Sequence, residues 1–282
     1  MSLINEPLRF SSEAQHEGLL PANVTLVGAG PGDPELLTVK AARALQAARL
    51  VLYDHLVSKE VLKLVGAEAE LIYVGKESGH HTLPQEGIIE MMVRLARSGR
   101  RVLRLKGGDP YIFGRGGEEA QGLAAAGVPF VVVPGISAAQ GAAAAAGMPL
   151  THRDHAESLG YATGHLRGEG AGRTVDLDWS MLARPRQTVV IYMGVGTLPI
   201  ISAQLQAHGL AGDTPAALIE RATLPEQRNV VGTLTTLPAL ARQHDVHSPA
   251  LIMIGTVVAL HRELGAVAYR VQDAQTQAAR DG

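Results

Sequence analysis

Short apolar runs alternate with amphipathic stretches through the first half of the chain. Each run is followed by a longer stretch in which apolar residues recur every three or four positions. This alternation predicts a strand–helix repeat, and therefore a parallel sheet covered by helices on both faces. The runs that predict strands are 24–27, 50–53, 71–74, 102–105 and 130–133, and the later helical stretches lie around 58–65, 85–98 and 116–126.

The first predicted helix follows a glycine-rich turn and carries the signals of a helix start. Pro34 suits the first helical position, and Asp33 before it is a residue type that caps helix N-termini. We therefore expect one continuous helix that begins at Pro34. Its apolar face would be formed by Leu37, Ala41, Ala44, Leu45 and Ala48.

After Pro134 and Gly135 the pattern changes. Residues 136–147 are mostly alanine and predict a tightly packed helix, whereas the stretch 164–175, rich in Gly and charge, predicts a loop. The further runs that predict strands are 159–163, 188–193, 216–219, 229–234 and 250–254. The chain length agrees with two domains at about 150 residues each. We divide the chain into a tail, two α/β domains and a second tail, at 1–21, 22–135, 136–264 and 265–282.

Composition and charge exclude several classes of protein. The 282 residues are 46% hydrophobic, which excludes disorder over most of the chain, and the absence of Cys excludes disulfides and cysteine-ligated zinc. A net charge of −2 argues against a nucleic-acid partner. No apolar run reaches the ~18 residues of a membrane span, and the first 20 residues lack the features of a secretory signal. We therefore expect a cytoplasmic protein that does not bind membranes.

The glycine-rich turn after the first strand, Gly28–Pro34, resembles a dinucleotide fingerprint, except that its sixth position is Asp33 rather than Gly or Ala. With Asp54 after the second strand as a ribose-binding acid, it leaves a nicotinamide-dependent oxidoreductase as an alternative. However, Pro31 lacks the N–H that could hold a pyrophosphate, and Asp33 would repel an anion at the helix start. The turn therefore favours a ligand other than a dinucleotide.

A second glycine-rich segment, KGGDPYIFGRGGEE at 106–119, follows the strand 102–105. Gly28–Pro34, Asp54, Lys76 and Gly107–Asp109 all come directly after predicted strands. In an open parallel sheet, ligands bind beyond the carboxyl ends of the strands, so these loops predict a single rim lined with backbone and carboxylates. Such a rim suits a cationic or zwitterionic ligand. A purely structural turn remains open for Gly28–Pro34 taken alone, and an ordinary helix-starting loop would also explain Glu118 and Glu119 in the second segment.

Two arginines are candidates for binding carboxylates, because a guanidinium can grip a carboxylate through two hydrogen bonds. Arg115 lies beside the second glycine-rich loop, with Glu118 one helical turn away to set its geometry. For Arg153, an ion pair with Asp154 or Glu157 is the structural alternative. We expect no metal site, because the histidines lack cysteine or helical acid partners. Those histidines are His80, His81, His152, His155 and His165.

Taken together, these segments resemble the uroporphyrinogen-III C-methyltransferases, a family of the S-adenosylmethionine-dependent tetrapyrrole methylases. The resemblance covers most of residues 24–262. The motifs that carry it are VGAGPGDPELLT at 27–38, VLYDHLVS at 51–58, YVGKESGHHTLPQ at 73–85, RLKGGDPYIFGRGGEE at 104–119, VPGISAA at 133–139, GMPLTHRDHAES at 147–158, ATGH at 162–165 and IYMG at 191–194.

The resemblance implies a parallel sheet in the N-terminal domain, a mixed sheet in the C-terminal domain, an active site in the cleft between them, and a homodimer. It implies that S-adenosyl-L-methionine, without a metal, methylates uroporphyrinogen III at C2 and C7. The products would be precorrin-2, made through precorrin-1, and S-adenosyl-L-homocysteine. Precorrin-2 would feed sirohaem, cobalamin or haem d1 synthesis.

Carried over by position, the resemblance implies that Asp54 is the proton acceptor and Lys76 the proton donor. Arg115 is a rival for handling the proton and is also a substrate contact. The other substrate contacts would be Glu118, His152 and Arg153. The cofactor contacts would be Pro31, Gly107, Gly108, Asp109, Ile112, Ser137, Ala138, Met193 and Ala222.

Two of the cofactor assignments depart from the usual pattern. Position 137 is Ser where Thr is usual in the family. Position 222 is Ala where Gly is common, so its contact would be made through the backbone. On residue type alone, Met193 would more often be a core residue. Three alternatives stay open: the oxidoreductase, a tetrapyrrole carrier without activity, and a methyltransferase acting on another corrin intermediate.

Overall fold

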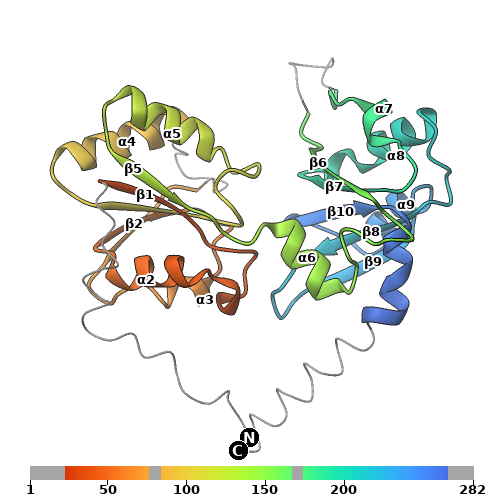
Figure 1. Cartoon of the computed structure of the whole chain (residues 1–282), viewed down its shortest axis with the longest axis horizontal. Helices are drawn as coiled ribbons and strands as arrows, with labels where there is room; N and C mark the ends of the chain where they lie inside the picture. Colours follow the sequence, from red (N-terminus) through yellow and green to blue (C-terminus); the bar gives the residue numbers. More distant parts are fainter. Residues whose placement is uncertain (1–22, 76–83, 167–173, 266–282) are drawn as a thin grey trace, which may run out of the picture. The chain divides into compact units, whose positions relative to one another are not determined.

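The computed structural model describes residues 23–75, 84–166 and 174–265. The chain divides into two compact units, Met1–Ser137 and Ala138–Gly282, and each has its own five-stranded sheet (Figure 1). The first predicted tail, 1–21, and nearly all of the second, 265–282, lie outside the described residues. Within the described residues, no helix is both long enough and apolar enough to cross a membrane.

The sheet of the first unit is entirely parallel, as the alternating pattern predicts. Its strand order is β3-β2-β4-β1-β5. Because all strands run the same way, the loops that follow them share one edge, here called the carboxyl edge of the first unit. The strands are β1 (Val24–Gly28), β2 (Leu50–Tyr53), β3 (Glu70–Tyr73), β4 (Val102–Lys106) and β5 (Phe130–Val133).

Helices cover both faces of this sheet (Figure 1). Apolar residues of α2 (Val39–Ala47) and α3 (Lys59–Leu62) form one buried cluster with strand residues such as Val51 and Leu105. Residues of α4 (Gln85–Arg97) and α5 (Gly116–Ala125) form a second cluster on the other face, with Leu26 and Leu52. Adjacent strand positions thus alternate between two cores, which confirms the predicted three-layer arrangement.

The predicted helix after the glycine-rich turn begins later than expected. Asp33 caps only a short 3-10 turn, η1 (Pro34–Leu36), through a 2.9 Å hydrogen bond from the N–H of Glu35. The chain is extended at Leu37 and Thr38, and the Thr38 hydroxyl then accepts from the N–H of Ala41 to start α2. The continuous helix from Pro34 was wrong because a second capping residue restarts the helix at Val39.

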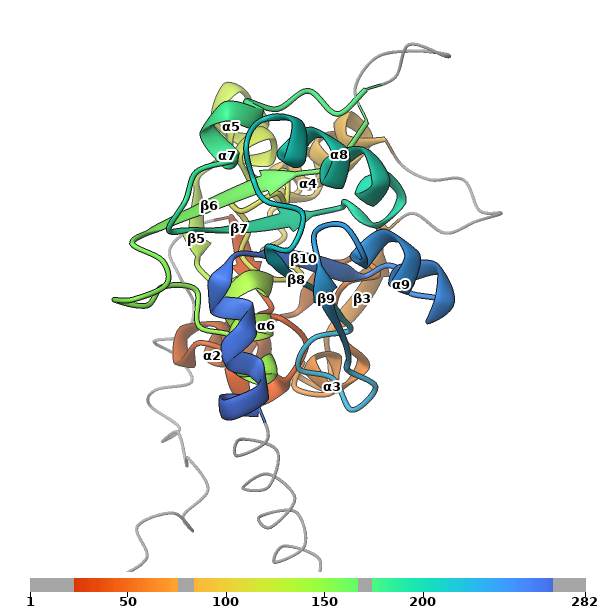
Figure 2. The same cartoon turned by 90° about the vertical axis from the view of Figure 1, so that its right-hand side faces the viewer.

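The sheet of the second unit is mixed, with order β6-β7-β10-β8-β9 (Figures 1 and 2). β6 pairs with β7 in parallel, while β10 runs antiparallel to both β7 and β8. β6, β7 and β8 therefore point the same way, and the loops after them share the carboxyl edge of the second unit. The strands are β6 (Ser158–Thr163), β7 (Gln187–Tyr192), β8 (Pro215–Glu220), β9 (Arg228–Thr233) and β10 (Ala250–Ile254).

Helices also cover both faces of the sheet of the second unit, and its hydrophobic core is divided into two clusters. The alanine-rich helix α6 (Ala138–Ala146) packs on one face with Val190, Ala217 and Met253. The helices α7 (Trp179–Leu182), α8 (Leu198–Ala207) and α9 (Leu237–Gln243) contribute to the larger cluster on the other face. The predicted alanine helix and all five predicted strands are therefore present, with ends that differ by a few residues.

Candidate functional site

Three glycine loops meet in backbone contact at the carboxyl edge of the first unit. A Cβ added to Gly28 would lie 2.5 Å from the nitrogen of Gly135, and one added to Gly135 would lie 2.3 Å from the carbonyl oxygen of Gly108. Gly30 and Gly108 exchange two hydrogen bonds, with N···O distances of 3.2 and 2.7 Å. The glycines are therefore needed for loop-to-loop packing, because any side chain would collide with backbone.

Five of the predicted cofactor residues lie on these loops or directly beside them. Asp109 fixes the arrangement, because its Oδ2 accepts from the N–H of Gly135 at 3.0 Å and its Oδ1 from that of Tyr111 at 2.8 Å. Since β1 and β4 are neighbours, the loops that follow them are adjacent. The structure thus brings together Pro31, Gly107, Gly108, Asp109 and Ile112.

Asp54 follows β2, the other neighbour of β4, and so lies at the same edge. Its side chain is 19% exposed. Its Oδ1 accepts from the N–H of Leu56 at 3.2 Å, and its Oδ2 accepts from the Arg104 guanidinium at 3.0 Å. The predicted proton acceptor is therefore reachable from solvent and held by two donors.

A buried group of charged residues lies beneath this edge and was missed by the sequence analysis. Arg104 and Lys106 on β4 both donate to Oε1 of Glu119 on α5, at 3.2 and 2.9 Å. The exposed fractions of the Arg104 and Glu119 side chains are 3% and 0%. We call Arg104, Lys106 and Glu119 the buried charge cluster. The signal available in the sequence was two basic residues inside an otherwise apolar strand, VLRLK.

Burial lowers the pKa of Lys106, and the nearby positive charge of Arg104 lowers it further. The charge of Glu119 and its hydrogen bond act in the opposite direction. The net result is a lysine whose charged form is less favoured than in water.

Arg115 and Glu118 form a two-bond ion pair at the start of α5. Arg115 Nε donates to Oε1 of Glu118 at 2.8 Å, and its Nη2 donates to Oε2 at 2.6 Å. The hydrogen bond raises the pKa of Arg115 and lowers the pKa of Glu118. Because both side chains are about half exposed, the pair stabilises the fold by only about 0.2–1 kcal/mol, but it does orient the guanidinium as the spacing predicts.

The loop that carries His152 and Arg153 is a tight turn in the second unit. His152 and Ala156 form an isolated bridge, and His152 Nδ1 accepts from the N–H of Asp154 at 3.1 Å. Arg153 is exposed, and its carbonyl oxygen accepts from Arg186 at 2.8 Å. Glu157, a suggested partner of Arg153, pairs with Arg186 instead.

The cofactor candidates of the second unit lie near the carboxyl ends of β7 and β8. Met193 follows β7 and is 52% exposed, so the expectation from residue type of a core position was wrong. Ala222 follows β8, and both it and Ala138 pack against the cluster under α6. Ser137, the last residue of the first unit, is buried. Lys76, like His80 and His81, lies outside the described residues.

Unusual backbone conformations gather in the same loops. Seven non-glycine residues in the described part of the chain have positive φ. Five of them lie beside predicted site residues or are such residues themselves. This conformation costs of order 1–3 kcal/mol and is concentrated at active sites and ligand clamps. The five are Phe113, Arg115, Met193, Arg221 and Thr223.

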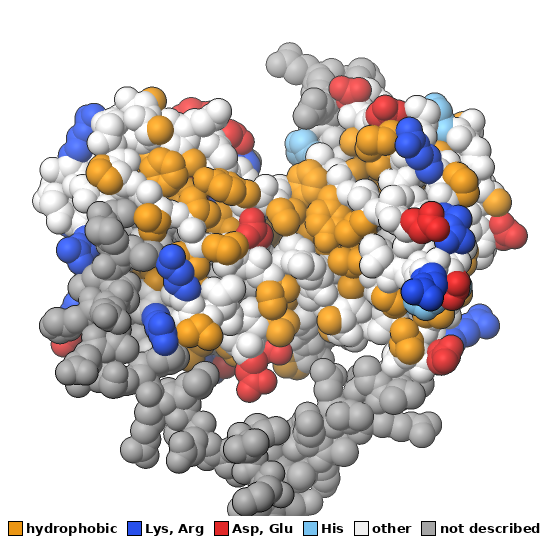
Figure 3. All heavy atoms as spheres, viewed as in Figure 1, with side chains coloured by type: hydrophobic (Ala, Val, Ile, Leu, Met, Phe, Trp, Pro, Cys, Tyr) orange, Lys and Arg blue, Asp and Glu red, His pale blue; other side chains and the backbone are white. Residues whose placement is uncertain are grey.

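Exposed apolar side chains also occur near these strand ends. Leu56, Tyr111 and Phe113 in the first unit and Met193 in the second are each more than a third exposed. Figure 3 shows hydrophobic side chains gathered on the drawn face of each unit. Such surface suits an organic ligand with a large apolar area.

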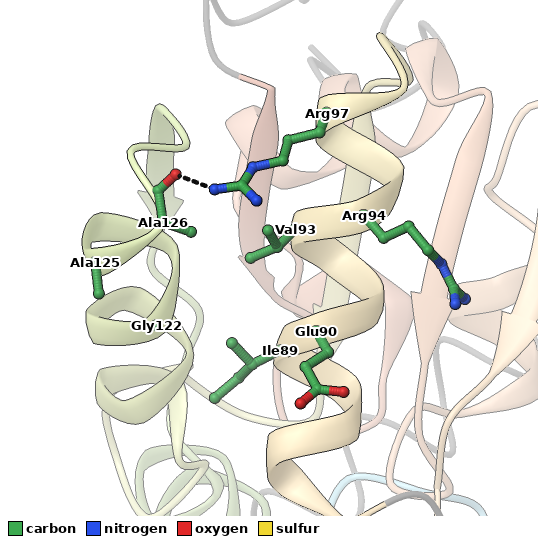
Figure 4. Close-up of a pocket in the computed structure, with 8 residues that line it drawn as sticks. All are labelled: Ile89, Glu90, Val93, Arg94, Arg97, Gly122, Ala125 and Ala126. Atoms are coloured by element: carbon green, nitrogen blue, oxygen red, sulfur yellow. Dashed lines mark hydrogen bonds between the residues drawn. The ribbon is translucent and has the colours of Figure 1, made fainter.

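A separate groove lies between α4 and α5, with a volume of about 700 Å³ (Figure 4). Its floor forms where Gly122 of α5 faces Ile89 of α4, since a Cβ at Gly122 would lie 2.4 Å from the Ile89 side chain. Arg97 donates to the carbonyl oxygen of Ala126 at one end. The groove contains none of the predicted site residues and lies on the helices, away from the carboxyl edge.

A sequence comparison places the chain in a family. The sequence model of the tetrapyrrole (corrin/porphyrin) methylases matches residues 23–238. The chain belongs to the tetrapyrrole methylases. A siroheme synthase of Thioalkalivibrio sulfidiphilus is 57% identical over 241 residues, which are 86% of this chain and 48% of that protein. The chain therefore spans about half the length of the curated relatives it matches.

Solved structures of other tetrapyrrole methylases share both units. A uroporphyrin III C-methyl transferase from Thermus thermophilus is 43% identical, with a TM-score of 0.71 over 84% of this chain and 99% of that one. A structure of a transferase of this name from the same organism, complexed with S-adenyl homocysteine, has 42% identity and a TM-score of 0.70, over 83% and 92% of the two chains. A cobalt precorrin-4 methyltransferase has 29% identity and a TM-score of 0.72, over 85% and 99%.

Proposed function

We propose that this chain is an S-adenosyl-L-methionine-dependent methyltransferase that methylates uroporphyrinogen III at C2 and C7 to give precorrin-2. The observation that carries the proposal is the 43% identity to the Thermus thermophilus enzyme, with 99% of that chain matched. The match does not depend on the part of the siroheme synthases that lies outside the matched residues.

A methyltransferase for another corrin intermediate is the strongest alternative. Fold does not separate the two, because the TM-scores are 0.72 for the cobalt precorrin-4 enzyme and 0.71 for the uroporphyrin III enzyme. Sequence identity does favour the uroporphyrin III enzyme, at 43% against 29% for the cobalt precorrin-4 enzyme. The segments KGGDPYIFGRGGEE and PLTHR favour it as well.

The glycine loops fit a sulfonium cofactor better than a dinucleotide. The N–H groups of Gly30 and Gly108 are already bonded to each other's carbonyl oxygens, so the turn does not offer them to a pyrophosphate. Pro31 has no N–H, and the Asp109 carboxylate lies beside the turn. When bound, the cofactor supplies an activated methyl group on a positively charged sulfur. These features argue against the nicotinamide alternative.

We propose that residues of both units hold this cofactor. In the first unit they are the loop residues described above together with Ser137. In the second unit the exposed Met193 and the backbone of Ala222 take part, with Ala138 at the start of α6. The complete proposed set is Pro31, Gly107, Gly108, Asp109, Ile112, Ser137, Ala138, Met193 and Ala222.

The residues of the chain then align the substrate and move its proton. Attack by a pyrrole carbon on the methyl group leaves a cationic ring that must lose a proton, and we assign Asp54 as the acceptor. Lys76 is the proposed proton donor, with Arg115 as a rival for proton handling. Arg115, Glu118, His152 and Arg153 would contact the substrate and its carboxylates. We expect no metal requirement, because the departing thioether is neutral.

The remaining expectations concern the cellular location of the protein, its binding partners and the use of its product. We expect a cytoplasmic homodimer that binds neither nucleic acid nor membranes. The product would serve sirohaem, cobalamin or haem d1 synthesis.

The decisive experiment incubates the purified chain with S-adenosyl-L-methionine and anaerobically prepared uroporphyrinogen III. We expect the mass of the product to increase by two methyl groups, with one S-adenosyl-L-homocysteine formed for each. Binding of the tetrapyrrole without transfer would instead indicate a carrier. Transfer only to a more methylated corrin precursor would indicate the related enzyme.

A further inference from the structure

Among the residues that the structure describes, the side chain that joins the buried charge cluster to Asp54 is Arg104. This guanidinium donates from Nη2 to Asp54 Oδ2 at 3.0 Å and from Nε to Glu119 Oε1 at 3.2 Å. Its Nη1 donates to the carbonyl oxygens of Leu105 at 2.8 Å and Leu52 at 3.5 Å. All three nitrogens are therefore engaged, so the plane of the guanidinium is fixed and its bond toward Asp54 has one direction.

Glu119 anchors this arrangement from the neighbouring helix. Its Oε1 accepts from Arg104, Lys106 and Gln85, at 3.2, 2.9 and 3.2 Å. Its backbone N–H donates to the carbonyl oxygen of Arg115 at 3.2 Å, which ties the cluster to the first turn of α5. The two proposed functional groups, Asp54 and Arg115, are thus linked through Arg104 and Glu119.

Stability alone is a weak explanation for the cluster. Three charged side chains almost fully removed from water carry a large desolvation penalty, and apolar residues of similar size often stabilise a core equally well or better. A fixed cation beneath a carboxylate that is 19% exposed, in contrast, has an evident use in proton transfer, because a proton acceptor must be held in one orientation.

We propose that Arg104, anchored by Glu119, is a positioning residue for Asp54. It donates to Oδ2, while the N–H of Leu56 donates to Oδ1, and each oxygen of the carboxylate has a further lone pair with which it could accept a proton. This inference rests on the proposed function, in which Asp54 accepts the proton released after methyl transfer. Lys106 contributes less to the positioning of Asp54, because it donates to Glu119 and has no hydrogen bond to Asp54 among the described residues.

The test compares three variants of the full chain in the uroporphyrinogen III assay. Arg104→Lys keeps the charge but replaces the planar fork with a single ammonium group. We expect its kcat to fall at least about tenfold, with both KM values within about twofold of wild type. Glu119→Gln should reduce kcat less, since its amide oxygen can still accept from Arg104. Lys106→Met should reduce kcat least, because both bonds from Arg104 to the carboxylates remain.

A structural control separates positioning from loss of stability. Breaking a buried ion pair can impair folding, so kcat is expressed per site that binds S-adenosyl-L-homocysteine. Met92→Ala, in the apolar core under α4, serves as a matched destabilised variant and should keep the wild-type kcat per binding site. Crystal structures of wild type and Arg104→Lys give a readout independent of activity. We expect one Asp54 conformer in wild type and several in the variant.

The outcomes are distinct. Full kcat for Arg104→Lys, or an unchanged Asp54 conformer in that variant, overturns the positioning role while the methyltransferase stands. A fall in kcat that Met92→Ala reproduces at equal loss of melting temperature also overturns it. If wild type transfers no methyl group at all, the proposed function fails and this inference fails with it.

Discussion

Different kinds of side chain are buried beneath the loops at the carboxyl edges of the two sheets. Beneath the loops of the first unit lie three buried charged side chains, Arg104, Lys106 and Glu119. Beneath the corresponding loops of the second unit lie alanines of α6 and apolar strand residues, and its buried Glu220 is paired with Arg228, which is half exposed. The comparison indicates that fixed charge is concentrated in the first unit, whereas the second offers an apolar support for exposed contact residues.

The difference matters for chemistry. Charges held in a water-poor interior act more strongly than the same charges in solvent. We therefore assign proton handling to the first unit and expect substitutions of its charged side chains to change turnover. Substitutions at the edge of the second unit should change binding. The following predictions test this division, from the largest effect to the smallest.

Gly135→Ala should have the largest effect. The new Cβ would lie 2.3 Å from the carbonyl oxygen of Gly108, so the glycine loops would have to separate. We expect a loss of about 1–3 kcal/mol in the free energy of unfolding, measured in urea, from overpacking. We also expect S-adenosyl-L-homocysteine to bind at least about tenfold more weakly by calorimetry, because ångström displacements of positioning loops are costly.

Gly117→Ala is the matched control for that variant. Gly117 lies in α5, and apart from its chain neighbours and the nearby backbone of the helix itself, no atom of the described residues lies within 4 Å of an added Cβ. Its φ is not positive. The free energy of unfolding of Gly117→Ala should equal that of wild type or exceed it by about 0.4–1 kcal/mol. If Gly135→Ala and Gly117→Ala have the same free energy of unfolding and the same affinity for S-adenosyl-L-homocysteine, the close contacts of Gly135 are not required.

Arg115→Lys should reduce kcat/KM for uroporphyrinogen III at least about tenfold, because an ammonium cannot reproduce a two-bond grip on a carboxylate. Steady-state kinetics measures the effect. Arg97→Lys is the control and should leave kinetics unchanged, because the Arg97 side chain donates to the carbonyl oxygen of Ala126, beyond the C-terminal end of α5. A fully active Arg115→Lys enzyme would remove Arg115 from the site.

Arg153→Ala should raise KM for uroporphyrinogen III about tenfold, since a lost charge-assisted hydrogen bond is worth about 1.5–3 kcal/mol. The affinity for S-adenosyl-L-homocysteine should stay within about twofold, measured by calorimetry. Arg242→Ala, another exposed arginine of the second unit, is the matched control. Unchanged KM in Arg153→Ala would contradict its role as a substrate contact.

Lys106→Met should reveal a small pH effect on stability. Because burial lowers the pKa of Lys106 below 10.5, the folded chain releases this proton at a lower pH than the unfolded chain. Between those two pH values the unfolded state binds more protons, so stability rises with pH. Urea unfolding of both proteins should show wild type gaining stability over Lys106→Met as pH rises toward 10.5.

The matched control for the pH series is Lys63→Met, which removes an exposed lysine paired with Glu60. For each variant, the quantity compared is the difference in free energy of unfolding from wild type as a function of pH. If this difference changes with pH no more for Lys106→Met than for Lys63→Met, burial does not alter the titration of Lys106.

Most of the architecture could be predicted because its signals are local. Apolar runs and helical spacing predicted the ten strands found in the described residues, the helices of the first unit and α6, since side-chain periodicity reflects the geometry of each element. The helices α7, α8 and α9 of the second unit were not predicted. The start of α2 was missed because Asp33 and Thr38 are both good caps, and the sequence does not show which of them starts a helix. The rim of the first unit followed from the parallel sheet, whose loops after the strands must share an edge.

The sequence by itself therefore determined the elements, the parallel first sheet and the motifs that resemble the methyltransferases. Only the tertiary structure decided which side chains meet. Arg104 contacts Asp54 across 50 positions and Glu119 across 15, and Met193 turned out to be exposed at a strained bend. Spacing along the chain reports the geometry within one element, whereas burial and ion pairing depend on how several elements pack, which no local pattern records.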